Sequence, residues 1–256
     1  MEGMTTPPTQ KMEWRRAWKA VRELIADPQR TDLAFEVIDA LSGTSFDRSF
    51  ERFRTHPDGR RLLAERPSLL ATLSNREALS AMPLGSFGRA YVEFMQSGSL
   101  TAEGLVEAQA VMMTRTIEQP IDPDRRFFSD RVRDMHDLWH VLTGYGMDEA
   151  GEAANLAFNL GQIPNLGIAM ILLAVIAIGP KDLSFSWPRY LYRARQRGQR
   201  AALLTVVRYE ELLARPLDEV RQLLHIQPAH EAHPHGILVG NRVMSSNSWI
   251  LSWSSE

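Results

Sequence analysis

Two histidines and an aspartate stand close together in the stretch RDMHDLWHVLTGYG, and their spacing suits metal chemistry. His136 and His140 are four residues apart, so on a helix they lie one turn apart on the same face, with Asp137 beside them. The opposite face of that helix is apolar. Two imidazoles in this arrangement can point at one ion, as the paired histidines of H-E-x-x-H helices do. The sequence therefore predicts a metal site on this helix.

A second polar stripe follows on the next predicted helix, Asp148 to Gln162. Glu152, Asn155 and Asn159 recur there at three- and four-residue spacing, and apolar residues fill most of the rest. The linker TGYGMD contains two glycines, enough for a reversal that turns Glu152 toward the histidines. Metal sites in bundle cores are built this way, from inward-facing carboxylates and histidines on adjacent helices.

Other interpretations fit the same residues. Helical histidines can be core residues bonded to carbonyl groups, a His–Asp pair can be a surface salt bridge, and short motifs also match by chance. We favour the metal site over these interpretations. Without an ion, two facing polar stripes would bury unpaired polar groups, which costs free energy. A zinc hydrolase is a further alternative, since HDLWH resembles H-E-x-x-H. Against it, Asp137 is one methylene shorter than the usual general base, and no peptide-binding strand is evident.

The composition narrows the choice of ligands and partners. The chain has 256 residues and no cysteine, so a metal must use His, Asp or Glu. A formal net charge of −2 argues against nucleic-acid binding. The Arg-rich segment at residues 189–200 is interpreted as a solvated face, with contact to an anionic lipid surface as the alternative. The apolar run from Leu166 to Gly179 is shorter than the roughly 20 residues of a membrane-spanning helix.

Helical periodicity dominates the chain and predicts an all-α, single-domain helical bundle. A continuous helix from about Pro123 to Thr143 should carry the histidines, and another is expected at residues 101–113. The tail GILVGNRVMSSNSWILSW contains strand-like pieces around two glycines, which favours a short irregular or hairpin-like end. We divide the chain into a disordered N-terminus (1–12), an all-α domain (13–226) and a C-terminal tail (227–256).

The motif also resembles that of a known family. His136-Asp137, two residues, His140, eleven residues and Glu152 reproduce H-D-x-x-H-x(11)-E, the signature of the Coq-four family of ubiquinone (coenzyme Q) biosynthesis proteins. Residues 135–167 and the segment from Glu210 to Ile226 resemble that family as well. The resemblance implies an all-helical protein that binds a divalent metal, zinc or iron. Its metal ligands would be His136, Asp137, His140 and Glu152.

The same resemblance implies a polyprenylated ubiquinone precursor as ligand, with a membrane surface and other ubiquinone biosynthesis proteins as partners; it leaves a homodimer open. The implied reaction is an oxidative decarboxylation, in which hydroxyl replaces the C1 carboxylate of a prenylated 4-hydroxybenzoate-derived ring. Members from eukaryotes carry a mitochondrial targeting segment, which is not recognisable here. We therefore expect a bacterial protein, cytoplasmic and peripheral at the inner membrane.

Roles for individual residues follow from this resemblance and from the chemistry. We expect His136, Asp137 and Arg133 to be catalytic, with Arg133 as a cation near the substrate carboxylate, and Asn155 and Asn159 to support the metal ligands. An apolar helix directly after the Glu152 helix could wall a channel for the prenyl tail. Its lipid-binding residues would be Leu166, Ile168, Ile171, Leu172 and Val175. The alternative function is a non-catalytic prenyl-lipid-binding scaffold in which the metal is structural.

Overall fold

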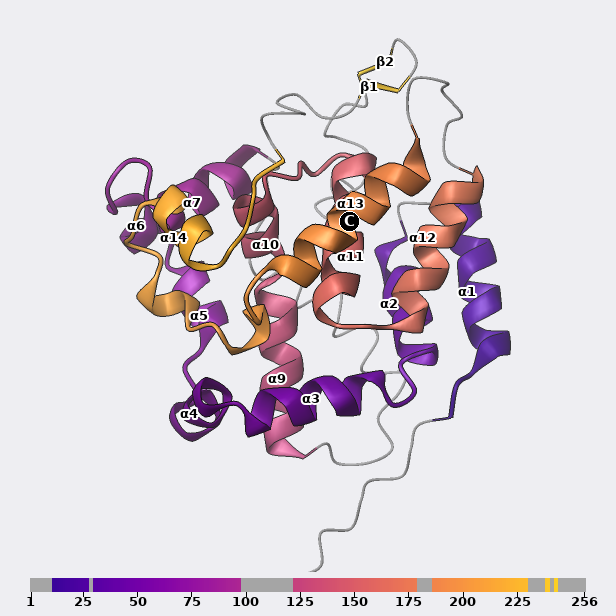
Figure 1. Cartoon of the computed structure of the whole chain (residues 1–256), viewed down its shortest axis with the longest axis horizontal. Helices are drawn as coiled ribbons and strands as arrows, with labels where there is room; N and C mark the ends of the chain where they lie inside the picture. The colour runs from indigo at the N-terminus through magenta and orange to yellow at the C-terminus, as the bar shows by residue number, and fades with distance from the viewer. Residues whose placement is uncertain are drawn as a thin grey trace, which may run out of the picture.

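Helices form nearly all of the regular structure in the computed structural model, which describes residues 11–27, 30–97, 122–178, 186–229, 238–239 and 242–243 (Figure 1). The predicted all-α class is confirmed. The α-helices are α1 (Trp14–Ala26), α2 (Thr31–Ala40), α3 (Ser45–Thr55), α4 (Pro57–Glu65), α5 (Leu69–Ser74), α6 (Arg76–Ser80), α7 (Phe87–Ser97), α9 (Pro123–Asp134), α10 (His136–Thr143), α11 (Glu149–Gln162), α12 (Leu166–Ile178), α13 (Trp187–Arg200) and α14 (Leu217–Leu223).

Short elements complete the described chain. Two 3-10 turns, η1 (Leu204–Val206) and η2 (Tyr209–Glu211), lead into α14. In the tail, β1 (Leu238–Val239) pairs antiparallel with β2 (Arg242–Val243), as a hairpin-like end predicts. The expected helix at 101–113, residues 1–10 of the expected disordered terminus and most of the predicted tail lie outside the described residues.

The predicted helix from Pro123 to Thr143 is two helices, α9 and α10, which meet at Met135. Met135 has φ −84° and ψ −3°, so the chain turns more tightly there than in an α-helix. Its N–H still bonds to the Arg131 carbonyl, and its carbonyl accepts from the Trp139 N–H. The prediction of one continuous helix was therefore wrong, although the break leaves His136 and His140 one turn apart on α10.

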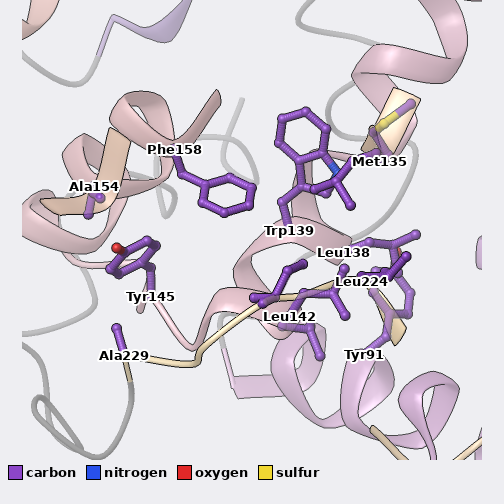
Figure 2. Close-up of a cluster of buried hydrophobic side chains, with 14 of the residues drawn as sticks. Tyr91, Met135, Leu138, Trp139, Leu142, Tyr145, Ala154, Phe158, Leu224 and Ala229 are labelled. Carbon is purple, nitrogen blue, oxygen red and sulfur yellow. The ribbon is translucent and has the colours of Figure 1, made fainter. Parts of the chain in front are cut away.

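The apolar face of α10 is the centre of the main core. Leu138, Trp139 and Leu142 are buried there, between side chains of neighbouring helices (Figure 2). The Trp139 ring meets Phe158 of α11 edge to face at 5.8 Å, and its Nε1–H donates to the Tyr209 hydroxyl at 2.9 Å. Because one face of α10 is fixed in this way, its histidine face has a defined direction.

The C-terminal part of the described chain also holds α10. The Arg221 guanidinium donates to the carbonyl groups of Val141 and Leu142, both at 2.9 Å, and the Ala229 N–H donates to the Thr143 carbonyl at 2.6 Å. The last carbonyls of a helix have no partner within the helix, so these bonds satisfy groups that would otherwise be unpaired. Residues 221–229 thus support the helix that carries the histidines.

Glycines let α13 lie close against α11, the helix that carries Glu152. A Cβ on Gly198 would stand 2.1 Å from the Phe158 carbonyl oxygen, and one on Gly161 would stand 2.5 Å from the Arg195 carbonyl oxygen. No larger residue fits at such distances without moving the backbone. The contact is further fixed by Gln162, whose amide donates to the Gly198 carbonyl at 2.5 Å and accepts from the Leu204 N–H at 2.9 Å.

Helix α12 packs beside α1 and α2 at one side of the molecule (Figure 1). Ile171 is buried in a small apolar cluster with residues of α1 and α2, whereas Ile168 and Leu172 belong to the main core. Within the described part of the chain, every helix is either too short or too polar to traverse a lipid bilayer.

Candidate metal centre

Three side chains from α10 and α11 converge: His136, His140 and Glu152. Glu152 Oε2 lies 3.4 Å from His140 Nε2 and 3.9 Å from His136 Nε2. One possible ligand atom from each residue lies within 4.8 Å of the other two. Metal bonds to nitrogen and oxygen are about 2.0–2.2 Å long, so small side-chain rotations would bring all three onto one ion. The expected meeting of the two polar stripes is confirmed at these residues.

Local sequence explains why Glu152 reaches the histidines. Helix α10 ends at Gly144, which adopts a left-handed conformation with φ 71° and donates its N–H to the His140 carbonyl. Glycine adopts this conformation without strain, so the chain can reverse there. Asp148 then caps α11 by accepting from the N–H groups of Ala150 and Gly151. Glu152 follows in the first turn, on the side that faces α10.

The His140 ring is oriented by a backbone carbonyl and an aromatic ring. Its Nδ1 lies 3.1 Å from the Tyr145 carbonyl oxygen, which can only accept, so Nδ1 carries the proton. Phe94 of α7 stacks on the imidazole at 5.4 Å between centroids. The tautomer leaves Nε2 directed at the cluster, and partners on the second ring nitrogen orient metal-binding histidines in this way.

Asp137 lies against the other histidine. Its Oδ1 is 3.0 Å from His136 Nδ1, and the Asp137 side chain is almost fully buried. If Nδ1–H donates to this carboxylate, His136 Nε2 is free to face Glu152. Among the described residues, the three groups that the geometry brings within reach of one ion are therefore His136, His140 and Glu152, with Asp137 behind His136.

The electrostatics of the cluster favour a cation. Burial of His140 disfavours its charged form, but the carboxylate of Glu152 outweighs burial and raises the pKa of His140 above its ordinary 6.5. For Glu152, burial acts to raise the pKa, but the nearby charge of His140 outweighs it and holds that pKa below its ordinary 4.5. Each group thus stabilises the charged form of the other.

His140 Nε2 provides a test of whether the residues fit a metal. This nitrogen is buried and makes no hydrogen bond within the described part of the chain, with Glu152 Oε2 3.4 Å away. Because Nδ1 holds the ring proton, Nε2 presents a lone pair toward a carboxylate, which offers only further electron density. A buried polar group in this position requires a proton or a metal ion. The donor set of two imidazoles and one carboxylate therefore fits a divalent metal.

The remaining polar residues of α11 have different surroundings. Asn155 is buried, and its Oδ1 has no hydrogen-bond partner among the described residues. Asn159, one turn further on, is half-buried. Gln162 is used to join α11 to α13. Of the polar residues on α11, Glu152 therefore belongs to the cluster and Gln162 to the contact with α13.

Arg133, the predicted cation for the substrate carboxylate, stands at the end of α9. It contacts Asp134 at 2.6 Å and Asp130 at 3.1 Å, and it is largely buried. Two carboxylates thus share its charge in this structure. A substrate carboxylate at Arg133 would have to compete with Asp130 and Asp134.

The predicted lipid-binding residues do not share one environment. Leu166 keeps 47% of its surface exposed, Val175 is half-buried, and the other three are at most 6% exposed. The three buried residues are Ile168, Ile171 and Leu172.

Sequence reasoning missed Phe94 and Tyr145. Phe94 lies on α7, far from the motif in sequence, and no local pattern connects it with His140. Tyr145 acts through its backbone carbonyl, which every residue type has. The two glycines beside Tyr145 were the available signal, because they mark a turn whose carbonyls can point back at the preceding helix.

The fold and the cluster define a class: an all-helical protein with a histidine–carboxylate site between two of its helices. The family model described as Coenzyme Q (ubiquinone) biosynthesis protein Coq4 matches residues 8–230. The chain therefore belongs to the Coq4 family of ubiquinone biosynthesis proteins, and the resemblance seen in its motif is confirmed.

Individual relatives agree with this assignment. The chain is 26% identical over 207 residues to the ubiquinone biosynthesis protein COQ4 homolog, mitochondrial, of Aedes aegypti, covering 79% of this chain and 71% of the relative. It is 29% identical over 204 residues to the ubiquinone biosynthesis protein COQ4, mitochondrial, of Yarrowia lipolytica, covering 78% and 74%. A crystal structure from Nostoc punctiforme shares the fold, with a TM-score of 0.59 at 20% identity, over 84% of this chain and 98% of that one.

The relatives overturn the expected location. The sequence predicted a bacterial protein, cytoplasmic and peripheral at the inner membrane. The matching relatives from Aedes aegypti, Danio rerio and Yarrowia lipolytica are all named as mitochondrial, so that prediction is wrong. Its error was to infer the compartment from the N-terminal residues of the sequence.

Proposed function

We propose that this member of the Coq4 family is a metal-dependent enzyme that acts on a polyprenylated ubiquinone precursor. The reaction replaces the C1 carboxylate of a prenylated 4-hydroxybenzoate-derived ring by hydroxyl. Its balance requires dioxygen and a two-electron reductant: the ring–carboxylate bond breaks, a ring–oxygen bond forms, and carbon dioxide and water leave. The family supports the pathway, and the histidine–carboxylate cluster supports the metal.

His136, His140 and Glu152 would hold the metal. Asp137 would keep His136 in the tautomer that offers Nε2, and the Tyr145 carbonyl does the same for His140. A bound iron would supply the dioxygen chemistry that this reaction needs, whereas zinc would supply Lewis acidity. Two imidazoles and one carboxylate leave coordination positions open in either case.

The exposure of two ligand residues carries the proposal of an enzyme. The His136 and Glu152 side chains keep 27% and 21% of their surface exposed, while His140 is buried. The cluster is therefore open on the side of His136 and Glu152. Structural metal sites are closed by protein ligands, whereas catalytic sites keep a position open for water or substrate. This observation favours catalysis over the alternative of a non-catalytic prenyl-lipid scaffold.

The substrate has a charged head and a long apolar tail, and the two ends need different surroundings. We propose that the head lies at the open side of the cluster, where Arg133 would attract the carboxylate if it exchanges Asp130 for the substrate, with Asn155 as a further polar contact. The tail would lie along α12, for which the half-exposed Leu166 and half-buried Val175 are better placed than the three residues packed in the core.

Turnover by purified protein tests this proposal. The protein is loaded with iron(II) or zinc(II) and given a short-chain prenylated 4-hydroxybenzoate, dioxygen and a reductant, and carbon dioxide and the hydroxylated ring are measured. We expect turnover with iron. Stoichiometric metal binding without turnover for either metal would favour the scaffold instead.

A matched pair of variants compares the loss of a proposed ligand with the loss of a histidine that lies away from the cluster. His140→Asn removes a proposed ligand. His56→Asn removes a histidine whose Nδ1 accepts from the Asp58 N–H and caps α4, a role that asparagine fulfils well. Activity should be lost only in His140→Asn.

A further inference from the structure

Helix α1 turns two tryptophans away from the core. Its inner face, Ala17, Ala20, Val21 and Leu24, is buried, whereas Trp14 and Trp18 are 56% and 60% exposed. Tryptophan is highly buried on average in folded proteins. Two exposed indoles one turn apart on the same helix therefore mark a surface that something can cover.

Cations accompany these indoles. Arg15, Lys19 and Arg22 are exposed on the same side of α1, because at 100° per residue they and the two tryptophans all fall on one half of the helix circumference. Lys19 lies 3.9 Å from Glu23, the only acidic residue of the helix. Within the described residues, Arg15 and Arg22 make no ion pair with a carboxylate. The face is therefore aromatic and positively charged.

Further large apolar side chains are exposed on α1 and on the helix beside it. Ile25 of α1 is 39% exposed, on the same side as the tryptophans. Helix α12, which packs against α1 (Figure 1), exposes Leu173 at 65% and Leu166 at 47%, seven residues apart and so on one stripe. Large exposed apolar side chains thus gather on these two neighbouring helices.

The chemistry of the face distinguishes between possible occupants. A second copy docking through the same face in a twofold pair would bring these cations against themselves. Indole rings settle at the headgroup level of a bilayer, and Lys and Arg next to an apolar face attract anionic lipids. Helices that lie in a membrane interface combine these two features. The occupant that matches both is an anionic bilayer.

We propose that the exposed face of α1, formed by Trp14, Arg15, Trp18, Lys19, Arg22 and Ile25, docks on a bilayer that contains anionic phospholipids. This deepens the proposed function, because a polyprenylated substrate would reach the protein from that bilayer. The face itself is independent of the metal chemistry. Charge brings the protein to the surface, and the indoles hold it at the headgroups.

Co-sedimentation with vesicles tests the proposal. The full chain should bind phosphatidylcholine vesicles that contain phosphatidylglycerol and bind phosphatidylcholine alone much more weakly, and salt should weaken the binding. Arg15→Gln/Arg22→Gln should reduce the affinity about 25-fold, because each cation near an anionic surface contributes about fivefold. Trp14→Ala/Trp18→Ala should abolish stable binding. All four side chains are exposed, so helical content should be unchanged in both double variants.

Matched variants elsewhere on the surface show whether α1 is responsible. Leu84→Ala changes an apolar side chain that is 82% exposed, and Arg189→Gln/Arg193→Gln removes two exposed cations of α13. Both should bind vesicles like wild type. Equal loss in the α13 variant, wild-type binding by the tryptophan variant, or no preference for anionic lipid would overturn the proposal. So would a tryptophan-dependent dimer, which would assign the face to a second copy.

Metal content separates this proposal from the proposed function. The α1 variants should keep full metal binding, and His140→Asn should keep full vesicle binding. Failure of vesicle binding alone rejects the docking face, whereas failure of metal binding alone rejects the metal centre.

Discussion

Helices α10 and α12 both pack into the main core, but only α10 has a polar stripe opposite its apolar face. In α10, Leu138, Trp139 and Leu142 enter the core, and this fixes where His136 and His140 point. In α12 every position from Leu166 to Ile178 is apolar or glycine. Its pattern predicts burial on every side, whereas the structure leaves Leu166 and Leu173 47% and 65% exposed. An amphipathic helix therefore predicts which side chains meet, whereas a uniformly apolar one does not.

The largest expected effect comes from a matched pair on α12. Ile171→Asp places a carboxylate in the cluster between α1, α2 and α12, where Ile171 is 5% exposed, and we expect it to lower the free energy of unfolding by about 4 kcal/mol or more. Leu173→Asp, at a position 65% exposed, should cost about 1 kcal/mol or less. Denaturant unfolding measures both. Equal costs would mean that α12 is not packed as described.

Replacement of His140 should affect binding and leave the fold intact. His140→Asn removes one of three proposed ligands, and we expect metal affinity to fall by more than the roughly 10- to 100-fold that outer partners of a site contribute. Most of the core does not touch His140, so helical content should stay near that of wild type. Elemental analysis after dialysis gives the metal content. A full complement of metal in this variant would remove His140 from the site.

The site was predictable to the extent that it is local in sequence. His136, His140 and Glu152 lie on two consecutive amphipathic helices joined by a turn with glycines, so periodicity alone brought them together. The break at Met135 was not predictable, because no proline or glycine marks it. Phe94 was missed because its contact with His140 depends on how α7 packs, which is decided by the whole core.

The sequence could not show which side of α12 is buried or which side chains contact Arg133, and the reasons are related. Ile171 was a natural candidate for a lipid channel, since nothing on α12 distinguishes one side from another. Arg133 is followed directly by Asp134 and preceded by Asp130 one turn earlier, and only the side-chain geometry shows that both contact it. In each case the deciding interaction was long-range or conformational.

Asp137 variants test how the polar face of α10 orients its histidines for metal binding. If it orients His136, Asp137→Ala should lower metal affinity about 10- to 100-fold, and Asp137→Asn should restore much of the loss, because its amide oxygen can still accept from Nδ1. If Asp137 instead binds the metal directly, both variants should lose as much as His140→Asn. Isothermal titration with the metal distinguishes the two roles.

The smallest effect concerns the proton that competes with the metal at His140. The raised pKa of His140 stabilises the metal-free fold below its unfolded value of about 6.5, and this contribution is lost as pH rises through the folded pKa. The lowered pKa of Glu152 stabilises the metal-free fold above the unfolded pKa of about 4.5. This contribution is lost as pH falls through the folded pKa of Glu152. The pair therefore stabilises the metal-free protein most between about pH 4.5 and 6.5.

Metal binding should show the opposite trend over the same range. Neutral His140 is required for binding, so affinity should rise with pH, by up to about tenfold per unit below the folded pKa of His140, and level off above it. In thermal unfolding, metal-free wild type should be more stable than Glu152→Gln in the acidic window and should lose this advantage as pH rises through the folded pKa of His140. Metal affinity that is constant from the acidic window to alkaline pH would show that the proton and the metal do not share Nε2.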